Sequence, residues 1–480
     1  MSIKHDRKTG ITRLVVSTGA LFCASILTPP STAEEPEKPT ISAQRMVPEQ
    51  NLPSLQGRVT DVASQSVPET LSIDRAVERA AAWHPDISTE VGKLFQAQEQ
   101  VNVAESRYYP QISGGVNNGV TNNYGYKGYS PSLVLSVSQL LYDFGKVSSS
   151  VREANAGVAM QQAKVLLSID NTAHDVAATL VQVQGYQQLV TIAREQLDAL
   201  NSIASLAEQR NNEGASNLSD VVQTRTRIEG AQATLIQYQA SLDRWRASLA
   251  SYLGWQTVNR VSDDFPNRLT RACEATPTDD QPVPSVLAAW AQANQAAAQL
   301  DGANAELLPT ITLEPEVTHY LNDRYANHDV QDRTQYSAWV RVKMPLYQGG
   351  GLTAARNAAQ HTLESANASL KSARLTASQQ LDEARNEASG LTLSLNSLQR
   401  QQKLGEETRQ LYQDQYLQLG TRPLLDVLNV EQEIYQTRFS EQQTISKLRS
   451  LQLDCLYSTG KIRQAFALNN QSIQGVEIQP

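Results

Sequence analysis

Two short stretches far apart in the chain, 214-GASNLSDVVQ-223 and 420-GTRPLLDVLN-429, follow one pattern. Each contains a glycine, five further residues, an aspartate, a valine, an aliphatic residue and an amide. The same 206 positions separate Gly214 from Gly420 and Asp220 from Asp426. A pattern that recurs at one offset indicates an internal duplication. The organisation of the chain follows from this duplication.

Other landmarks recur in the same order. The segment AESRYYPQI at 104–112 corresponds to ANAELLPTI at 303–311, and LYDFG at 141–145 corresponds to LYQGG at 346–350. Each half therefore predicts a helix, a β-hairpin, a long helix, a turn and a second helix. Five residues mark the transitions between helix and strand: Pro110, Pro309, Gly145, Gly349 and Gly350.

The long helices carry a strict seven-residue repeat of apolar side chains, which is typical of helices packed along a coiled-coil seam. The first runs from Val147 to about Asn211, a span of roughly 95 Å at 1.5 Å per residue. The helix that follows, from Asp220 to Leu253, is about half as long. The repeat positions of the first long helix are Val176, Val183, Val190, Leu197 and Ala204, and those of the second long helix are Leu370, Ala377, Ala384, Leu391 and Leu398.

The segments 109–144 and 309–349 have a different sequence pattern, in which apolar and polar residues alternate. In TITLEPEV, for example, Ile311, Leu313 and Val317 share one face, and Glu314 and Glu316 lie on the other. This alternation predicts β-hairpins with one apolar face. The fold class is therefore α+β, with long antiparallel helices and four strands per chain.

The N-terminus is typical of a targeting signal. Basic residues precede an apolar run at 14–27, and small residues follow it, so residues 1–33 are predicted to be a signal peptide cleaved after Ala33. The alternative is a retained membrane anchor. Residues 34–68 are rich in Pro, Glu, Gln and Ser and predict a flexible leader. A first repeat at 69–255, a connector at 256–284, a second repeat at 285–467 and a tail at 468–480 follow.

Composition excludes several classes of function. The net charge of −8 argues against a nucleic-acid partner. The chain has no Cys-x-x-Cys, no metal ligands paired at helical spacing and no nucleophile elbow, so neither an enzyme nor a cofactor is expected. The mature chain keeps two cysteines, Cys273 and Cys455, an even number suited to an oxidising compartment.

Four strands with an apolar face require a partner. The helices bury their own seams, so little apolar sequence remains to cover the sheet, and lipid is the other available partner. A sheet in lipid must close on itself, and about eight strands is the usual minimum. No segment after the signal has about 18 uninterrupted apolar residues, as a membrane helix would. We therefore expect an oligomer whose chains share one β-barrel joined to a helical tunnel; three chains would supply twelve strands.

In the order and spacing of these features the chain resembles the TolC family of outer-membrane channel proteins. The residues that carry the resemblance are the two halves, Pro110, Pro309, LLYDFGK, PLYQGG and GTRPLLDVLN. The resemblance implies a homotrimer in the cell outer membrane that extends into the periplasm. It also implies an exit duct for proteins, as in type I secretion and including large adhesins, or for small toxic molecules. The implied partners are outer-membrane lipid, a periplasmic adaptor protein and an inner-membrane ABC or proton-driven transporter.

The resemblance also assigns roles to the two repeated turns as tips of helical hairpins that close the periplasmic entrance. Arg422 resembles the family's arginine latch, Asp220 its partner on the first tip, and Asp426 an acid that rings the mouth. Asn429 stands where a second ring acid is common, Leu417 where a tyrosine joins the latch, and Pro423 stiffens the turn. From the family's placement of their segments, Cys273 and Cys455 are expected to lie close together as a disulfide.

Simpler interpretations remain beside these. Asp220 and Asp426 each lie at a helix start and would serve there as N-caps. Arg422 would equally be a solvated turn residue. For the whole chain, the alternative from another class is a soluble periplasmic coiled-coil scaffold or adaptor protein.

Overall fold

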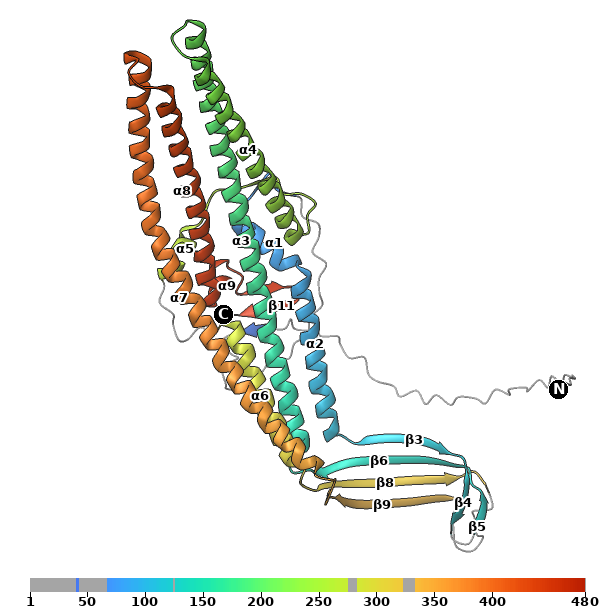
Figure 1. The fold of residues 1–480 in the computed structure, drawn as a ribbon. Coiled ribbons are helices and arrows are strands. Elements are labelled where there is room, and N and C mark those ends of the chain that lie inside the picture. The colour runs from blue at the N-terminus through green and yellow to red at the C-terminus, as the bar shows by residue number, and fades with distance from the viewer. Residues whose placement is uncertain (1–39, 43–66, 124–125, 275–282, 323–332, 480) are drawn as a thin grey trace, which may run out of the picture. The chain divides into compact units, whose positions relative to one another are not determined.

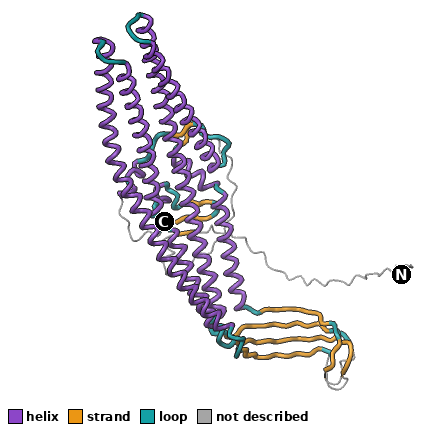
Figure 2. The backbone as a smooth tube through the Cα atoms, viewed as in Figure 1, coloured by secondary structure: helices purple, strands orange, loops and turns teal. Residues whose placement is uncertain are grey.

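The computed structural model describes residues 40–42, 67–123, 126–274, 283–322 and 333–479, which all belong to one compact unit within residues 37–480. Long helices dominate it (Figures 1 and 2), and the largest of its sheets has four strands. The predicted α+β fold class is confirmed. The principal helices are α1 (Ile73–Trp83), α2 (Pro85–Glu105), α3 (Lys146–Asn212), α4 (Leu218–Leu253), α6 (Pro284–Ala305), α7 (Gly351–Asp414) and α8 (Leu424–Ser458).

Local sequence explains where these helices begin and end. His84 ends α1 and caps α2, since its Nδ1 accepts from the backbone N–H of Asp86 at 3.4 Å. Pro85 then occupies the first position of α2, where its missing N–H costs nothing. At the start of α3 the carboxylate of Asp143 accepts from the backbone of Gly145 at 3.0 Å and of Val147 at 2.6 Å. This cap explains why the strand turns into a helix at LYDFG.

The sheet has the antiparallel order β3 (Gln111–Asn117), β6 (Ser132–Tyr142), β8 (Thr310–Tyr320) and β9 (Thr334–Lys343). A separate pair, β4 (Val120–Asn123) and β5 (Tyr126–Tyr129), continues the first hairpin. The strands β3 and β9 are the edges of the sheet. Opposite residues share a face, so Leu313 with Val340 forms part of an apolar face and Thr312 with Arg341 part of a polar one.

The helices follow the same order as the strands. Near the sheet, α3 packs between α2 and α6, and α6 packs on α7. Toward the turns, α3 packs between α4 and α8, and α8 packs on α7 (Figure 1). The helices α2 and α4 therefore lie at one end of this order and α7 at the other. Strand edges and helix edges coincide, since β3 follows α2 and β9 precedes α7.

The largest apolar core lies where the stacked helices meet, and it combines α1 with the middle of α3 and the ends of α4 and α8. Polar contacts support it. The buried Arg463 donates to Asp170 at 2.6 Å, and burial raises the pKa of that carboxyl to about 6 against the opposing effect of Arg463. For His174, burial alone would lower the pKa of the imidazole. The contacts with Asp175 and Asp454 outweigh burial and raise this pKa to about 9.

Two segments differ from the prediction. Within the leader, Thr40–Ser42 forms β1, which pairs in parallel with β11 (Val476–Gln479). The tail is an antiparallel hairpin of β10 (Gln471–Ile473) and β11, with Ile473 buried in the core. Gln474 in its turn donates to the carbonyls of Ala81 and His84. The tail is thus integral to the core, although its strands are too short for an alternating pattern to reveal them. The proposed signal peptide lies outside the described residues.

Candidate functional site at the two helical tips

The two repeated turns have related but unequal backbones. In the first, α3 ends at Asn212, Gly214 has φ +75°, and Asn217 precedes α4. In the second, α7 passes into a π-helical turn, η5 (Gln415–Leu419), and Gly420 then has φ +61°. Glycine suits both left-handed positions because it has no Cβ. The π-helical turn is confined to the second tip, and such turns are frequent at functional sites.

Arg422 is held within its own tip. Its Nε donates to Oε1 of Gln415 at 3.0 Å, and its Nη1 donates to Oδ2 of Asp426 at 2.9 Å. The guanidinium also lies over the ring of Tyr412, 4.0 Å from the centroid. The hydrogen bond to Asp426 raises the pKa of Arg422 above its usual value. We refer to these four residues as the Arg422 cluster.

Within a single chain, Arg422 pairs with Asp426 and not with Asp220, so the arginine and the presumed ring acid form one unit. Asp220 instead accepts from Oγ of Ser216 at 2.7 Å in the first tip. Arg422 pairs with Asp426 in preference to Asp220 because Asp426 lies only four residues later in the chain, close enough for direct contact. Pairing of Arg422 with Asp220 of a neighbouring chain stays a prediction.

Neither aspartate is a helix N-cap. The capping positions belong to Asn217 for α4 and Pro423 for α8, and both aspartates lie in the first helical turn. Negative charge there still interacts favourably with the helix dipole. The capping interpretation of Asp220 and Asp426 is therefore wrong in position, although both stabilise helix starts.

Asn429 contacts the other hairpin. Its Oδ1 accepts from Nη2 of Arg227 on α4 at 3.1 Å, and Arg227 also donates to Gln432 on α8. The residue predicted to replace a ring acid thus takes part in a polar link between α4 and α8. An aspartate at this position would place a full charge beside Arg227.

A second link between the tips was not predicted. The guanidinium of Arg210, at the end of α3, lies 4.7 Å from the ring centroid of Tyr416, and its Nη1 donates to the carbonyl of Tyr416 at 3.3 Å. Tyr416 is only 6% exposed, and burial raises its pKa. The sequence does hold a signal for this pair, because 206 positions separate the two residues, the same offset as in the repeated turns. Leu417, the position expected to lack a latch tyrosine, thus has a tyrosine as its neighbour.

An apolar cluster surrounds the Arg210–Tyr416 contact and joins both hairpins. It draws on α3, α4, η5 and α8, and its buried members are Leu200, Ile203, Ala207, Val221, Ala231, Tyr416, Leu424, Val427 and Leu428. The two tips are therefore packed together as well as hydrogen bonded. Any motion of one hairpin relative to the other must disrupt this cluster.

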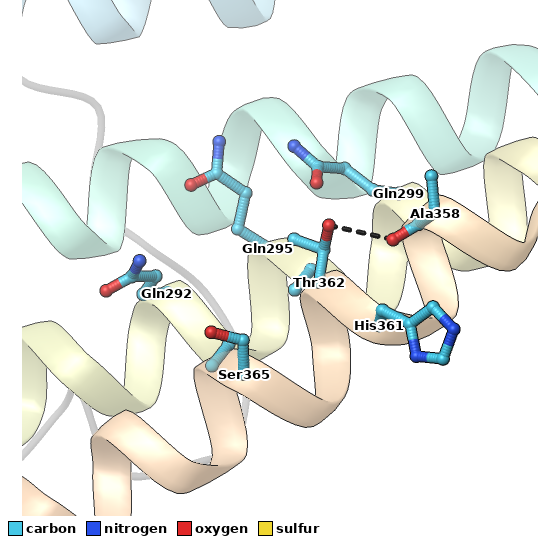
Figure 3. A pocket seen from close by; sticks show the side chains of 9 residues that line it. Gln292, Gln295, Gln299, Ala358, His361, Thr362 and Ser365 are labelled. Atoms are coloured by element: carbon cyan, nitrogen blue, oxygen red, sulfur yellow. Dashed lines mark hydrogen bonds between the residues drawn. The ribbon is translucent and has the colours of Figure 1, made fainter. Parts of the chain in front are cut away.

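Two polar grooves lie along the helices. One, of about 680 Å³, lies between the hairpins and is lined by residues of α3, α4 and α8, including Gln223, Thr226 and Gln432. The other, of about 450 Å³, lies between α6 and α7, where Gln292, Gln295 and Gln299 lie opposite Thr362 and Ser365 (Figure 3). Neutral amides and hydroxyls dominate both, which suits the packing of polar helices better than bond-breaking chemistry.

The remaining predicted residues lie at element boundaries. Pro110 and Pro309 directly precede β3 and β8, while Gly145 and Gly350 have positive φ and precede α3 and α7. Cys273 and Cys455 are joined as a disulfide. Among the described residues, no group of His, Cys, Asp and Glu side chains is arranged to hold a metal ion. Within the same residues, none of the helices has an apolar stretch of the length that crossing a bilayer requires.

Comparison with known proteins gives one consistent result. The sequence model of the family described as outer membrane efflux protein matches residues 76–255 and 281–453. The outer membrane efflux protein BepC of Brucella suis is 25% identical over 393 residues, 78% of this chain and 82% of its own. The outer membrane protein TolC of Salmonella enteritidis is 22% identical, with 84% of each chain covered. The crystal structure of VceC from Vibrio cholerae superposes with a TM-score of 0.71 at 17% identity, over 81% of this chain and 96% of its own.

The Arg210–Tyr416 contact generates a prediction about the tips. Tyr416→Ala removes the ring that Arg210 covers and leaves a cavity in the apolar cluster, so we expect faster protease cleavage within 413–423. Tyr416→Phe retains the ring and should be cleaved nearly as slowly as the unmodified protein. Arg225→Ala is the matched control, because Arg225 pairs with Glu208 inside the first hairpin. Equal cleavage of Tyr416→Ala and the unmodified protein would show that the contact does not hold the tips together.

Proposed function

The chain belongs to the outer membrane efflux protein family, the TolC family, and we propose that it forms the homotrimeric exit duct of a tripartite export system. As a family member it is a channel of the outer membrane that extends into the periplasm. The proposal adds the number of chains, the way in which they close, the gate and the partners. One observation supports the proposal most directly. In a single chain, the unpaired edge strands β3 and β9 are joined to the helices α2 and α7, which lie at opposite ends of the helix order.

The helix α7 shows how much of the chain lacks a partner. Only four of its 64 residues are buried, namely Ala366, Leu381, Ala384 and Ala388. Large apolar side chains remain exposed along it at intervals of 18, 11 and 7 residues, which return to nearly the same face of a helix. They are Leu375 (71% exposed), Leu393 (68%), Leu404 (61%) and Leu411 (60%).

The opposite end of the helix order offers a complementary surface. On α4, Val222 and Ile236 are exposed, and on α2, Val103 is exposed. If α7 packs against α2 and α4 of a neighbour, the same rotation brings β9 beside the neighbour's β3. Repeating that contact three times closes a ring, since three chains supply twelve strands and about eight is the smallest barrel in common use.

The two faces of the sheet suit a barrel in lipid. The apolar face includes Leu313 and Val340, while Glu314 accepts from Nε of Arg341 at 2.6 Å on the other face. Charge facing lipid costs about 2–4 kcal/mol near the bilayer midplane. The Glu314–Arg341 pair therefore faces the lumen, where it contributes fixed charge to the exit of the duct.

The tips suit a partner and a gate. Apolar side chains are exposed at both, including Leu218 on the first and Leu419 on the second. The polar groove between α4 and α8, of about 680 Å³, lies on the same two hairpins. We assign this end to a helical hairpin of the periplasmic adaptor, which links the duct to an ABC or proton-driven inner-membrane transporter. In the closed state the Arg422 cluster stiffens the second tip, and three copies of Asp426 concentrate negative potential at the mouth.

Assembly is tested on α7. Leu404→Glu places a charge in the proposed interface and should convert a detergent-extracted trimer into smaller species, as measured by native mass spectrometry. Gln399→Glu is the control, because it lies on a different face of the same helix. A trimer that persists in Leu404→Glu, or a water-soluble monomer of the unmodified protein, would contradict the proposed closure.

The gate is tested by single-channel conductance in planar bilayers. Arg422→Ser removes the contacts with Gln415, Tyr412 and Asp426 and should raise conductance without unfolding the protein. Asp426→Asn should also loosen the tip, since Asp426 accepts from Arg422, and should in addition lower cation selectivity. Arg225→Ser, which alters an exposed pair within the first hairpin, should conduct like the unmodified protein. Increased conductance in that control alone would place the gate elsewhere.

Cargo is tested by deleting the gene and comparing secreted proteins with sensitivity to toxic small molecules. Loss of a secreted protein with unchanged sensitivity would assign the duct to type I secretion. Increased sensitivity with an unchanged set of secreted proteins would assign it to efflux. Neither effect, in a strain without a second such duct, would count against export altogether.

A further inference from the structure

The connector between the two halves crosses several helices in turn. After α4 it first contacts α3, where the side chain of Gln187 donates to the carbonyl of Val261 and accepts from its N–H, both at 3.0 Å. One turn earlier on α3, Gln184 donates to the carbonyl of Ser262 at 2.6 Å. These paired amide contacts fix the connector across α3.

The connector next reaches α8 and α7. The guanidinium of Arg449 on α8 lies over the ring of Phe265 at 5.2 Å. Beyond the short helix α5 (Asn267–Thr270), the backbone N–H of Cys273 donates to Oε1 of Gln452 on α8 at 3.0 Å. Its carbonyl accepts from Nε of Arg385 on α7 at 3.2 Å. One short segment thus touches three helices that are distant in sequence.

The disulfide ends this path. Cys273 bonds to Cys455 on α8, 182 residues away, with 5.2 Å between their Cα atoms. Cys455 is fully buried, whereas Cys273 is partly exposed. We propose that Cys273 and Cys455 are a maturation site, oxidised by a thiol–disulfide oxidoreductase of the periplasm, and that the bond fastens the connector across the joint between α6 and α8. The inference depends on export to the periplasm and not on the cargo.

The oxidation proceeds by two exchanges. The Cys273 thiolate attacks the disulfide of the oxidoreductase, which forms a mixed disulfide and releases one of its sulfurs as a thiolate. The Cys455 thiolate then attacks Sγ of Cys273 and displaces the second sulfur. Two electrons pass to the oxidoreductase, which leaves as a dithiol, and the two cysteines lose two protons. Cys273 reacts first because it is the accessible thiol, and Cys455 completes the exchange from within the core.

The location explains what the bond does. Along α7, the packing partner changes from α6 to α8, and α8 ends at Ser458 while α6 begins at Pro284. Neither helix spans this joint, and only α7 and α3 continue past it (Figure 1). Besides the bond, the buried side chains of Leu269 and Ala272 and the hydrogen bonds of Cys273 with Gln452 and Arg385 hold the end of the connector there. The disulfide therefore restrains the base of the α7–α8 hairpin, at the end of α8 away from the tip.

The pairing and the order of attack are tested by alkylation and trapping. The mature protein, purified without reductant and alkylated after unfolding, should take no label on Cys273 or Cys455, and Cys273→Ser and Cys455→Ser should each take one. Cys455→Ser should also accumulate a mixed disulfide with the oxidoreductase through Cys273, whereas Cys273→Ser should not. Two free thiols in the unmodified protein, or trapping only by Cys273→Ser, would overturn the proposal.

The restraint is tested on the folded protein, which avoids variants that fail to fold. Reduction of the purified oligomer should increase protease cleavage in the connector several-fold, with cleavage at the tips unchanged. The connector of the double variant Cys273→Ser/Cys455→Ser should be cleaved as fast as that of the reduced protein, and adding reductant should not change its rate of cleavage. A connector cleaved equally fast before and after complete reduction would show that the bond fastens nothing.

Discussion

Backbone hydrogen bonding along the two open edges of the sheet is the constraint on which the rest of the structure depends. In hydrocarbon, each unpaired N–H or C=O group costs several kcal/mol, so β3 and β9 must be paired for the sheet to lie in a membrane. Among the described residues this sheet has no further strand, and its order is β3-β6-β8-β9. In the proposed assembly a neighbouring chain supplies the pairing, and the exposed leucines of α7 lie at the same end of the helix order as β9.

Closing the sheet determines how the helices are used. Because α7 continues from β9 and must reach the tip, it extends along the whole helical part and takes two partners in succession, α6 and then α8. The joint between them needs its own core, which explains why α1, the C-terminal hairpin and the connector all gather there. The buried pair of Arg463 and Asp170 ties that core to α3. A disulfide closing so long a loop is worth roughly 5 kcal/mol in the chain-entropy account. That restraint suits a joint at which both α6 and α8 end.

The sequence revealed the parts that repeat and missed those that do not. Seven-residue spacing identified the long helices because their seams extend over many turns, and alternation identified the hairpins because one face stays apolar. The strands β1, β10 and β11 were not predicted because three or four residues are too few to show a two-residue period. The π-helical turn escaped for a related reason, since a single extra residue in one turn leaves no compositional trace. The resemblance assigned Asp220 as the partner of Arg422, whereas within one chain the nearer carboxylate of Asp426 makes the contact, and pairing with Asp220 of a neighbouring chain stays a prediction.

Duplication also explains the chemistry at the tips. Arg210 and Tyr416 occupy equivalent positions in the two halves and meet where the hairpins pack together. Two identical residues in such a place would face each other, and two arginines would repel. Once one copy is tyrosine, the guanidinium lies against an aromatic face, a favourable arrangement that does not require a buried carboxylate. Inside the apolar cluster, this cation–π contact is stronger than an ion pair exposed to solvent. It also leaves no uncompensated negative charge when the hairpins separate. Such an interaction suits the proposed gate, because breaking it exposes a ring and a cation that water solvates readily.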